Sequence, residues 1–334
     1  MRRLLSTASR DLCHSLDDHD HVTMGQSLSE VFPPKPRFSV EDIQDLSGKV
    51  IIVTGGNSGI GKETIRAFLT RNARVYMASR NEDKANAAIQ ELKTDTGKEA
   101  IFLPLDLANL KSVRHAAEEF MSKEKQLHIL INGAGIMYLT SAPGYNEITE
   151  DGYDIQWGSN VVGPFLFIKL LIPALLEGVA TSEDRTSRVV FTASRLQTQS
   201  IQYDTLQDTT GRAKMSPSQR YAQSKFASVV LSADFSRRYG ERGLVSFAVN
   251  PGSIKTPLHR NSPAIYRPFA SLIHHPPAMG ALTQLWGTTT ASGGDLKGKY
   301  LIPWARIGKP VPSSQDPEVG RRLWDWLEEQ TRDK

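Results

Sequence analysis

The sequence has few of the features that mark disulfide-stabilised, membrane-spanning or nucleic-acid-binding proteins. Cysteine occurs once, at Cys13, so no disulfide can form within the chain. Lys and Arg number 40 and Asp and Glu 36, and a net charge of +4 without a long basic run argues against a nucleic-acid partner. The most apolar stretch, near 161–176, is interrupted by glycine, proline and lysine, so we expect no transmembrane span. No metal site and no internal repeat are predicted.

The chain has 334 residues, which is long enough for a substantial core. Residues 1–30 lack helix or strand periodicity, and we expect a disordered leader or a targeting segment there. The arginines at its start weakly resemble a mitochondrial presequence, although the acidic residues in 11–20 break that pattern. A start at Met24 would give MGQSLS, which fits myristoylation of Gly25 and a membrane-peripheral form. We expect a cytoplasmic protein, and both alternatives stay open.

The rest of the chain alternates apolar, β-branched segments with amphipathic ones. We expect strands at 49–54, 74–78, 100–105, 128–131, 188–192, 245–249 and 300–303. We expect helices at about 60–71, 84–93, 110–123, 153–176, 217–239, 278–291 and 316–330. This alternation predicts the α/β class, with a single Rossmann-like, doubly wound parallel sheet that carries helices on both faces. The domain would span 46–310, after a proline-rich arm at 31–45 and before a C-terminal helix in 311–334.

A glycine-rich turn follows the first strand, in the sequence KVIIVTGGNSGIGK at 49–62. Glycines permit a tight turn and a close approach of the backbone, and the start of a helix offers free N–H groups to an anion. In its strand–turn–helix context, the turn predicts a phosphate cradle. The residues expected to contact a nucleotide cofactor here are Thr54, Gly55, Asn57, Ser58, Gly59, Ile60 and Gly61.

Four polar residues further along form a candidate catalytic set. Tyr221 and Lys225 are four residues apart on a predicted helix, so they lie on one face of it. A nearby ammonium favours the phenolate, and we expect it to lower the pKa of Tyr221 toward neutral. Ser194 follows a buried strand, at the edge of the sheet where ligands bind, and Asn160 lies within the long helix. Taken singly, each has a simpler interpretation: Ser194 starts a turn at the end of a strand, and Asn160 faces solvent.

Taken together and in order, these motifs resemble the short-chain dehydrogenase/reductase family. The spacing T-G-x-x-x-G-x-G, the sequence NGAG at 132–135 and the sequence NPG at 250–252 match it over about 46–256, although Gly133 replaces the second Asn of the family's NNAG. The motif GGNSGIGKET, the YAQSKFAS helix and the long gap between Ser194 and Tyr221 look most like the retinol-dehydrogenase-like branch and its fungal relatives. Further cofactor contacts implied by the resemblance are Asp106, Leu107, Asn132, Ala134, Gly135, Tyr221, Lys225, Pro251, Gly252 and Thr256.

The resemblance implies an NADP(H)-dependent oxidoreductase that interconverts a carbonyl and an alcohol. Tyr221 would transfer the proton, Ser194 would polarise the oxygen, Lys225 would hold the nicotinamide ribose, and Asn160 would anchor a water in a proton relay. The alternative is a catalytically silent NAD(P)-binding regulator on the same fold, although the complete Asn–Ser–Tyr–Lys set argues against it.

The end of the second strand bears on the choice of cofactor. It reads Ala78-Ser79-Arg80, with no carboxylate for the ribose hydroxyls of NAD and with a guanidinium that can bind a 2′-phosphate. NADP(H) is therefore favoured over NAD(H), although the acids at 82 and 83 leave a solvated surface arginine as an alternative.

Two apolar segments, 136–149 and 257–277, are the expected sites of substrate recognition, and the second reads as a lid. They predict a hydrophobic small-molecule substrate, and a homo-oligomer is compatible with the sequence.

Overall fold

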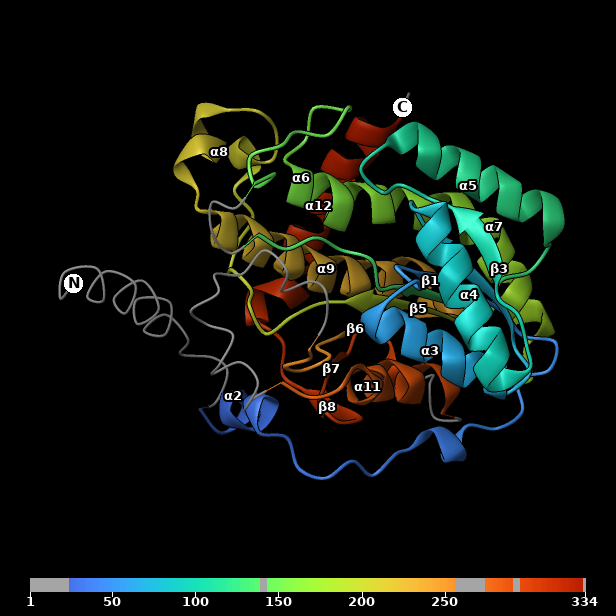
Figure 1. Cartoon of the computed structure of the whole chain (residues 1–334). Coiled ribbons are helices and arrows are strands. Elements are labelled where there is room, and N and C mark those ends of the chain that lie inside the picture. Colours follow the sequence, from blue (N-terminus) through green and yellow to red (C-terminus); the bar gives the residue numbers. More distant parts are fainter. Residues whose placement is uncertain (1–23, 139–142, 256–273, 291–294, 333–334) are drawn as a thin grey trace.

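The structure, a computed structural model, describes residues 24–138, 143–255, 274–290 and 295–332 (Figure 1). Its centre is an eight-stranded sheet in the order β3-β2-β1-β4-β5-β6-β7-β8. Neighbouring strands are parallel except β7 and β8, which are antiparallel. The strands are β1 (Val50–Thr54), β2 (Arg74–Ser79), β3 (Ile101–Pro104), β4 (Ile129–Asn132), β5 (Ser187–Thr192), β6 (Leu244–Val249), β7 (Tyr300–Ile302) and β8 (Arg306–Gly308).

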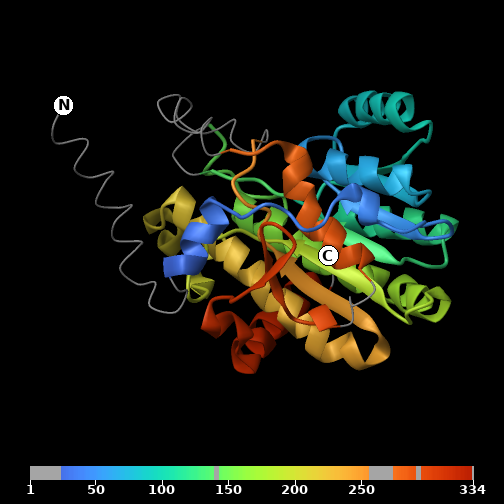
Figure 2. The same cartoon turned by 90° about the horizontal axis from the view of Figure 1, so that it is seen from below.

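Helices cover both faces of this sheet (Figures 1 and 2). They are α2 (Met24–Val31), α3 (Gly59–Thr70), α4 (Glu82–Thr96), α5 (Leu110–Lys123), α6 (Ile155–Trp157), α7 (Gly163–Thr181), α8 (Thr210–Lys214), α9 (Pro217–Tyr239), α11 (Pro277–Thr289) and α12 (Pro317–Thr331). Buried residues of α5, α7, α9 and α12 form the core on one face, and those of α3, α4 and α11 form the core on the other. The predicted doubly wound sheet is confirmed.

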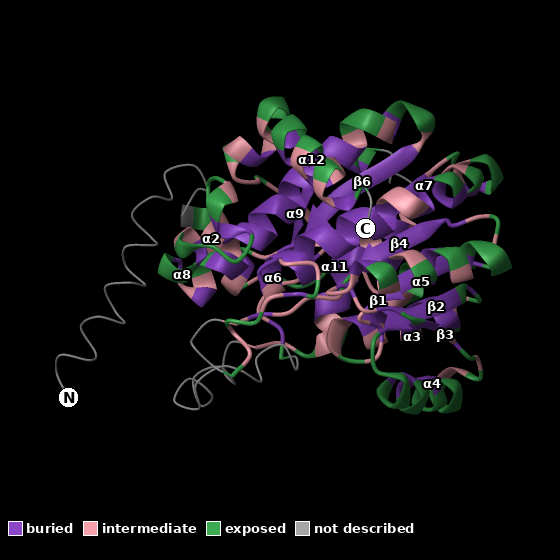
Figure 3. Cartoon of the chain, turned by 90° about the horizontal axis from the view of Figure 1, so that it is seen from above, coloured by how far each residue is buried: buried purple, intermediate pink, exposed green. Residues whose placement is uncertain are grey.

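The strands are apolar along their whole length because both of their faces are buried. In β1, Val50 and Ile52 pack into one core while Ile51 and Val53 pack into the other. Figure 3 shows this burial in the sheet and on the inner sides of the helices, with exposed residues on their outer sides. The sheet order reverses between β1 and β4, and in a parallel sheet a ligand crevice opens at such a point, outside the carboxyl ends of the strands.

The expected leader at 1–30 is wrong for its last seven residues. Residues from Met24 onward form α2, and Glu30 at its end is only 4% exposed. The side chain of Gln26 bonds to the Lys309 backbone in both directions, and Arg306 donates to the Ser29 carbonyl. No apolar periodicity marks these contacts in the sequence because polar side chains and backbone groups make them. Residues 1–23 lie outside the described part.

Two further elements differ from the sequence prediction. The antiparallel strand β8 was not expected, and it pairs with β7 across a turn that places Arg306 opposite Ile302. The long helix expected at about 153–176 is three segments, because a π-helical stretch, Gly158–Val162, separates α6 from α7. π-Helical bulges are often found at functional sites.

One stretch of helix is long and apolar enough to cross a bilayer. It covers Ile155–Thr181 with a mean hydropathy of 1.8, and 72% of its apolar window is buried inside the domain. Its residues Phe165, Phe167 and Leu171 belong to the core under the sheet, so packing accounts for its apolar composition.

Candidate active site

A cleft of about 840 Å³ opens at the carboxyl ends of β1, β4 and β5. The expected site residues that line it are Thr54, Gly55, Asn57, Ser58, Gly59, Ile60, Gly61, Arg80, Asp106, Leu107, Ala134, Gly135, Ser194, Tyr221, Lys225, Pro251 and Gly252. They come from seven separate turns or helices, so the fold brings together residues as far apart in the chain as Thr54 and Gly252. Asn132 and Asn160 are not among the lining residues, and Thr256 lies outside the described part.

In the turn after β1, the positions of Gly55, Gly56 and Gly61 have no room for a side chain. Gly55 has φ +70°, and a Cβ on Gly61 would lie 2.4 Å from the Gly55 carbonyl oxygen. The turn therefore packs backbone on backbone, and α3 begins directly against it at Gly59. This is the geometry in which backbone N–H groups and the start of a helix can face a phosphate.

Two buried hydroxyls on the cleft lack a partner among the described residues. The Oγ of Ser79 and the Oγ1 of Thr192 are both buried without a hydrogen bond, and both residues line the cleft. Buried polar atoms are normally satisfied, so each of these two marks a position where a bound ligand can supply the partner. Together with the glycine turn, they show that the residues present fit a dinucleotide.

Tyr221 lies one turn into α9, with its hydroxyl near the side chain of Ser194. The start of the helix is fixed by Ser216, which forms a reciprocal capping box with Gln219, and by Pro217 at the first position. Ser194 follows β5, and its backbone carbonyl accepts a hydrogen bond of 3.2 Å from the Tyr300 hydroxyl. The two hydroxyls expected to act on one carbonyl oxygen are therefore adjacent.

The expectation that Lys225 lowers the pKa of Tyr221 is wrong for this site. Burial raises the pKa of Tyr221 to about 12, and the neighbouring Ser194 side chain opposes this only in part. Burial also lowers the pKa of Lys225 to about 8. The ammonium is 5.7 Å from the centre of the Tyr221 ring and donates instead to the Thr192 carbonyl at 2.8 Å. Tyr221 thus keeps its proton at neutral pH, which suits a proton donor.

Asn160 lies in the π-helical stretch, buried rather than facing solvent. Its Oδ1 accepts from the Ile136 N–H at 2.9 Å, and its Nδ2 donates to the Ile136 carbonyl and to Ser224 Oγ, each at 3.0 Å. A Cβ on Gly135 would lie 3.1 Å from Asn160 Oδ1 and 3.5 Å from Lys225 Nζ. Asn160 therefore holds the loop after β4 beside Lys225, while the water relay stays a prediction.

Comparison with known proteins identifies the family. The family model for short chain dehydrogenase matches residues 49–266. The chain belongs to the short-chain dehydrogenase/reductase family. A short-chain dehydrogenase/reductase of Armillaria gallica is 48% identical over 306 residues, which cover 91% of this chain and 97% of the relative. Another from Neocamarosporium betae is 36% identical, covering 91% and 92% of the two chains.

Solved structures share the fold of this short-chain dehydrogenase/reductase. A crystal structure of an uncharacterized protein from Mycobacterium paratuberculosis has a TM-score of 0.66 at 25% identity and covers 88% of this chain and 97% of its own. A short chain dehydrogenase from Shigella flexneri complexed with NADP has a TM-score of 0.60 at 23% identity, covering 77% and 98%. These structures show the fold, and the family match with its curated relatives shows that the chain is an oxidoreductase of this family.

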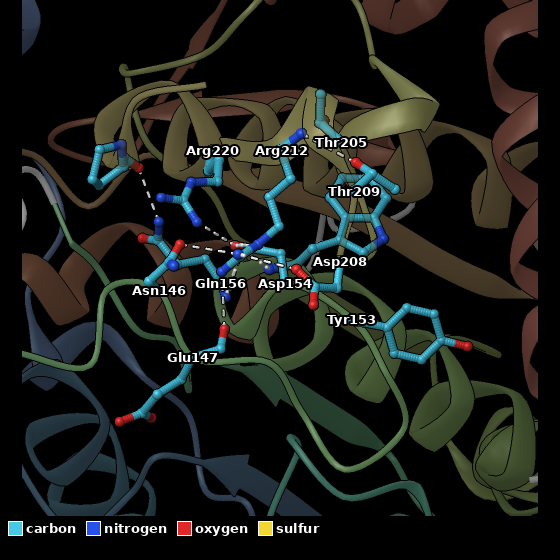
Figure 4. A network of polar contacts seen from close by, with 12 residues as sticks. Asn146, Glu147, Tyr153, Asp154, Gln156, Thr205, Asp208, Thr209, Arg212 and Arg220 are labelled. Atoms are coloured by element: carbon cyan, nitrogen blue, oxygen red, sulfur yellow. Dashed lines mark hydrogen bonds and ion pairs between the residues drawn. The ribbon is translucent and has the colours of Figure 1, made fainter. Parts of the chain in front are cut away.

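A buried polar network behind the active site of this oxidoreductase was not predicted. Figure 4 shows that Asp154, Arg212 and Arg220 converge from three segments. Asp154 Oδ2 accepts from Arg212 Nε at 2.9 Å and from Arg220 Nη1 at 2.8 Å, and none of these side chains is more than 4% exposed. Arg212 also donates to Asn146 Oδ1 and to the Glu147 carbonyl. The network fastens the loop before α6 and the segment with α8 to the start of α9, next to Tyr221.

Asn132 lies beneath the cleft, and the two predicted substrate segments lie partly outside the described residues. The Asn132 side chain donates to the Val190 carbonyl of β5 at 3.3 Å, so it bridges two strands beneath the cleft. Within 136–149, residues 139–142 lie outside the described part, as does the expected lid from 257 to 273. Met137 and Tyr138, from the expected segment 136–149, line the cleft, and so do Leu196 and Ile254, which the sequence did not single out. No motif marks them because apolar cleft residues resemble core residues in a sequence.

Proposed function

We propose that the protein is an NADP(H)-dependent enzyme that interconverts a carbonyl and an alcohol on a hydrophobic small molecule. The observation that carries the proposal is the pair of neighbouring Tyr221 and Ser194 side chains, which both line the cleft. The apolar side chains of Met137, Leu196 and Ile254 line the same cleft and support an apolar substrate. In the reverse direction, the same groups would oxidise an alcohol.

The proposed mechanism assigns each residue of the pair a separate task. Reduced nicotinamide, when bound, supplies a hydride to the carbonyl carbon. Ser194 donates a hydrogen bond to the carbonyl oxygen and stabilises the negative charge that develops there. Tyr221, which holds its proton at neutral pH, gives that proton to the oxygen. Lys225, whose Nζ donates to the Thr192 carbonyl, lines the same cleft and would bond to the ribose hydroxyls of the cofactor.

Turnover with a panel of apolar ketones and alcohols tests this proposal. NADPH with the ketones and NADP with the alcohols should give steady-state turnover, followed by absorbance of the reduced nicotinamide. Cofactor binding with no turnover on any panel member would favour the regulator alternative. The absence of cofactor binding would contradict both functions.

The preference for NADP(H) rests on the end of β2. Arg80 is exposed on the cleft, and among the described residues no carboxylate forms an ion pair with it. The unpartnered Ser79 Oγ lies beside it, and Lys84 also lines the cleft. A guanidinium can meet the 2′-phosphate of NADP with two parallel hydrogen bonds, whereas NAD has no phosphate there.

Arg80→Ala should weaken NADP binding strongly and leave NAD nearly unchanged. Charged hydrogen bonds contribute about 1.5–3 kcal/mol, which corresponds to roughly ten- to a hundredfold in affinity. Ser79→Asp should go further, because a carboxylate repels the phosphate and accepts from ribose hydroxyls. The measurement is the dissociation constant of each cofactor at fixed ionic strength.

Arg74→Ala is the matched control for this measurement. Arg74 begins the same strand at the opposite end from the cleft, where it pairs with Glu124, so its loss should change neither affinity. Equal losses of NADP and NAD affinity in Arg80→Ala would mean that Arg80 supports the loop without binding the phosphate. A wild-type protein that prefers NAD would contradict the assignment.

A further inference from the structure

The helix α2, at the start of the described chain, contacts a turn that lines the active-site cleft. Glu30, at the end of α2, is buried, and its Oε2 accepts a hydrogen bond of 3.0 Å from Asn250 Nδ2. Asn250 begins the Asn–Pro–Gly segment after β6, and Pro251 and Gly252 line the cleft. Figure 1 shows α2 beside β7 and β8, and the bonds of Gln26 and Ser29 to this edge hold it there.

The turn at 250–252 depends on the orientation of one amide group. Asn250 Oδ1 accepts from the Gly252 N–H at 3.0 Å, which closes a tight turn in which Gly252 has φ +85°. Only the oxygen of the amide can accept, so Nδ2 must point the other way, toward Glu30. If the amide were reversed, an NH₂ group would face the Gly252 N–H and the turn would lose its closing bond.

A carboxylate is the side chain that enforces this orientation, because an ionised carboxylate can only accept hydrogen bonds. The second oxygen of Glu30 is also engaged, since Oε1 accepts from Gln26 Nε2 at 2.8 Å. Burial raises the pKa of Glu30, while its two hydrogen bonds and the charges of Arg195 and Arg306 oppose that rise. Both carboxylate oxygens of Glu30 thus accept a hydrogen bond from an amide group. The Asn250 amide can therefore turn only its NH₂ group toward Glu30.

The same cluster continues to the strand end that carries Ser194. Tyr300 is buried in β7, and burial together with the nearby charge of Glu30 raises its pKa. Its hydroxyl also donates to the Ser194 carbonyl. A single buried group of side chains thus joins α2, the 250–252 turn and the backbone of Ser194.

We propose that Glu30 is a positioning residue of the active site, which orients the Asn250 amide so that the 250–252 turn is held against the cofactor cleft. The geometric part of this inference stands on the hydrogen bonds alone. Its consequence for catalysis rests on the function proposed above. By this inference α2 completes the active site, and its role is not that of a leader.

Amide hydrogen exchange at Gly252 in the full chain without ligand tests the geometric part. Glu30→Gln keeps the size of the side chain but places an NH₂ group against Gln26 or Asn250. We expect exchange at Gly252 to accelerate on the order of tenfold, since one charged hydrogen bond holds the orientation. Exchange at Ile52, in the centre of the sheet, serves as an internal reference and should be unchanged.

Ser29→Ala is the matched control, because it removes a contact between α2 and Arg306 without touching Asn250. It should leave Gly252 exchange unchanged. The inference is overturned if Glu30→Gln behaves like Ser29→Ala, or if Gly252 and Ile52 accelerate equally, which would indicate only global destabilisation. If Glu30→Gln does not fold, Glu30→Asp is the alternative variant. It keeps the charge but moves the carboxylate oxygens away from Asn250. Unchanged exchange at Gly252 in Glu30→Asp would overturn the inference.

A second measurement separates this inference from the proposed function. Direct titration with NADPH should give a dissociation constant that is several-fold higher in Glu30→Gln than in the wild type. Ser29→Ala should match the wild type. An unchanged dissociation constant together with unchanged kcat/KM would overturn the catalytic part. If the wild type binds no nicotinamide cofactor, the proposed function fails, and the exchange result at Gly252 still decides whether Glu30 holds the turn.

Discussion

Tyr221→Phe should abolish most turnover while NADP(H) still binds. In the proposed mechanism the hydroxyl carries the proton that the product oxygen receives, whereas the ring only packs in the cleft. Loss of a general acid typically costs about 10²–10⁴-fold in rate, so we expect kcat to fall by that factor. The dissociation constant of NADPH should stay within about twofold, because the glycine turn and the end of β2 remain intact.

Tyr239→Phe is the control for this variant. Tyr239 ends the same helix, where its ring stacks against Phe235 and does not line the cleft. It should retain wild-type turnover. Wild-type turnover in Tyr221→Phe on a verified substrate would show that another group donates the proton.

The pKa of Tyr221 shows how local spacing and tertiary packing can disagree. The i, i+4 spacing of Tyr221 and Lys225 was visible in the sequence, and it indicated a lowered pKa. The sequence cannot show that both groups are buried, nor that Lys225 Nζ bonds to the Thr192 carbonyl. Burial opposes the charged form of each group, so the pKa of the phenol rises and that of the ammonium falls.

The strands were predictable because their signal is local and redundant. In β1, four consecutive apolar residues pack into the two cores. A prediction of the strand that is wrong by one residue would therefore still place an apolar segment in the sheet. The π-helical stretch gave no such signal. Within it, Asn160 bonds to both the N–H and the carbonyl of Ile136, which lies 24 residues earlier in the chain.

Contacts over long chain separations account for the remaining differences. Glu30 and Asn250 are 220 residues apart, and neither lies in a pattern that predicts the other. The same holds for Asp154 and its two arginines, although Arg220 directly precedes Tyr221 in the sequence. Polar pairs of this kind leave no periodicity, so a single sequence points to candidate catalytic residues but not to the contacts that hold them in place.

The buried Asp154 network should be the most sensitive polar site for stability. Asp154 is the only carboxylate within ion-pair distance of Arg220 among the described residues, and it shares Oδ2 between two arginines. Removing one partner of a buried pair typically costs about 3–5 kcal/mol, because the remaining charge is left in a poorly solvated place. Here two guanidinium groups would be left, so we expect Asp154→Asn to lower the free energy of unfolding by about that amount.

The two oxygens of Asp154 have different roles, and a second substitution separates them. Oδ1 caps α6 by accepting from the Gln156 and Trp157 N–H groups, and an Asn side chain can keep these bonds. Asp154→Ala loses the cap as well, at a further cost of about 1 kcal/mol. Urea unfolding of both variants therefore measures the contributions of the charge and of the cap to the free energy of unfolding.

Asp208→Asn is the control for the charge. Asp208 is 3.9 Å from Arg212 and 77% exposed, and exposed pairs contribute at most about 1 kcal/mol. A loss in Asp154→Asn no larger than in Asp208→Asn would show that the arginines are satisfied without the carboxylate.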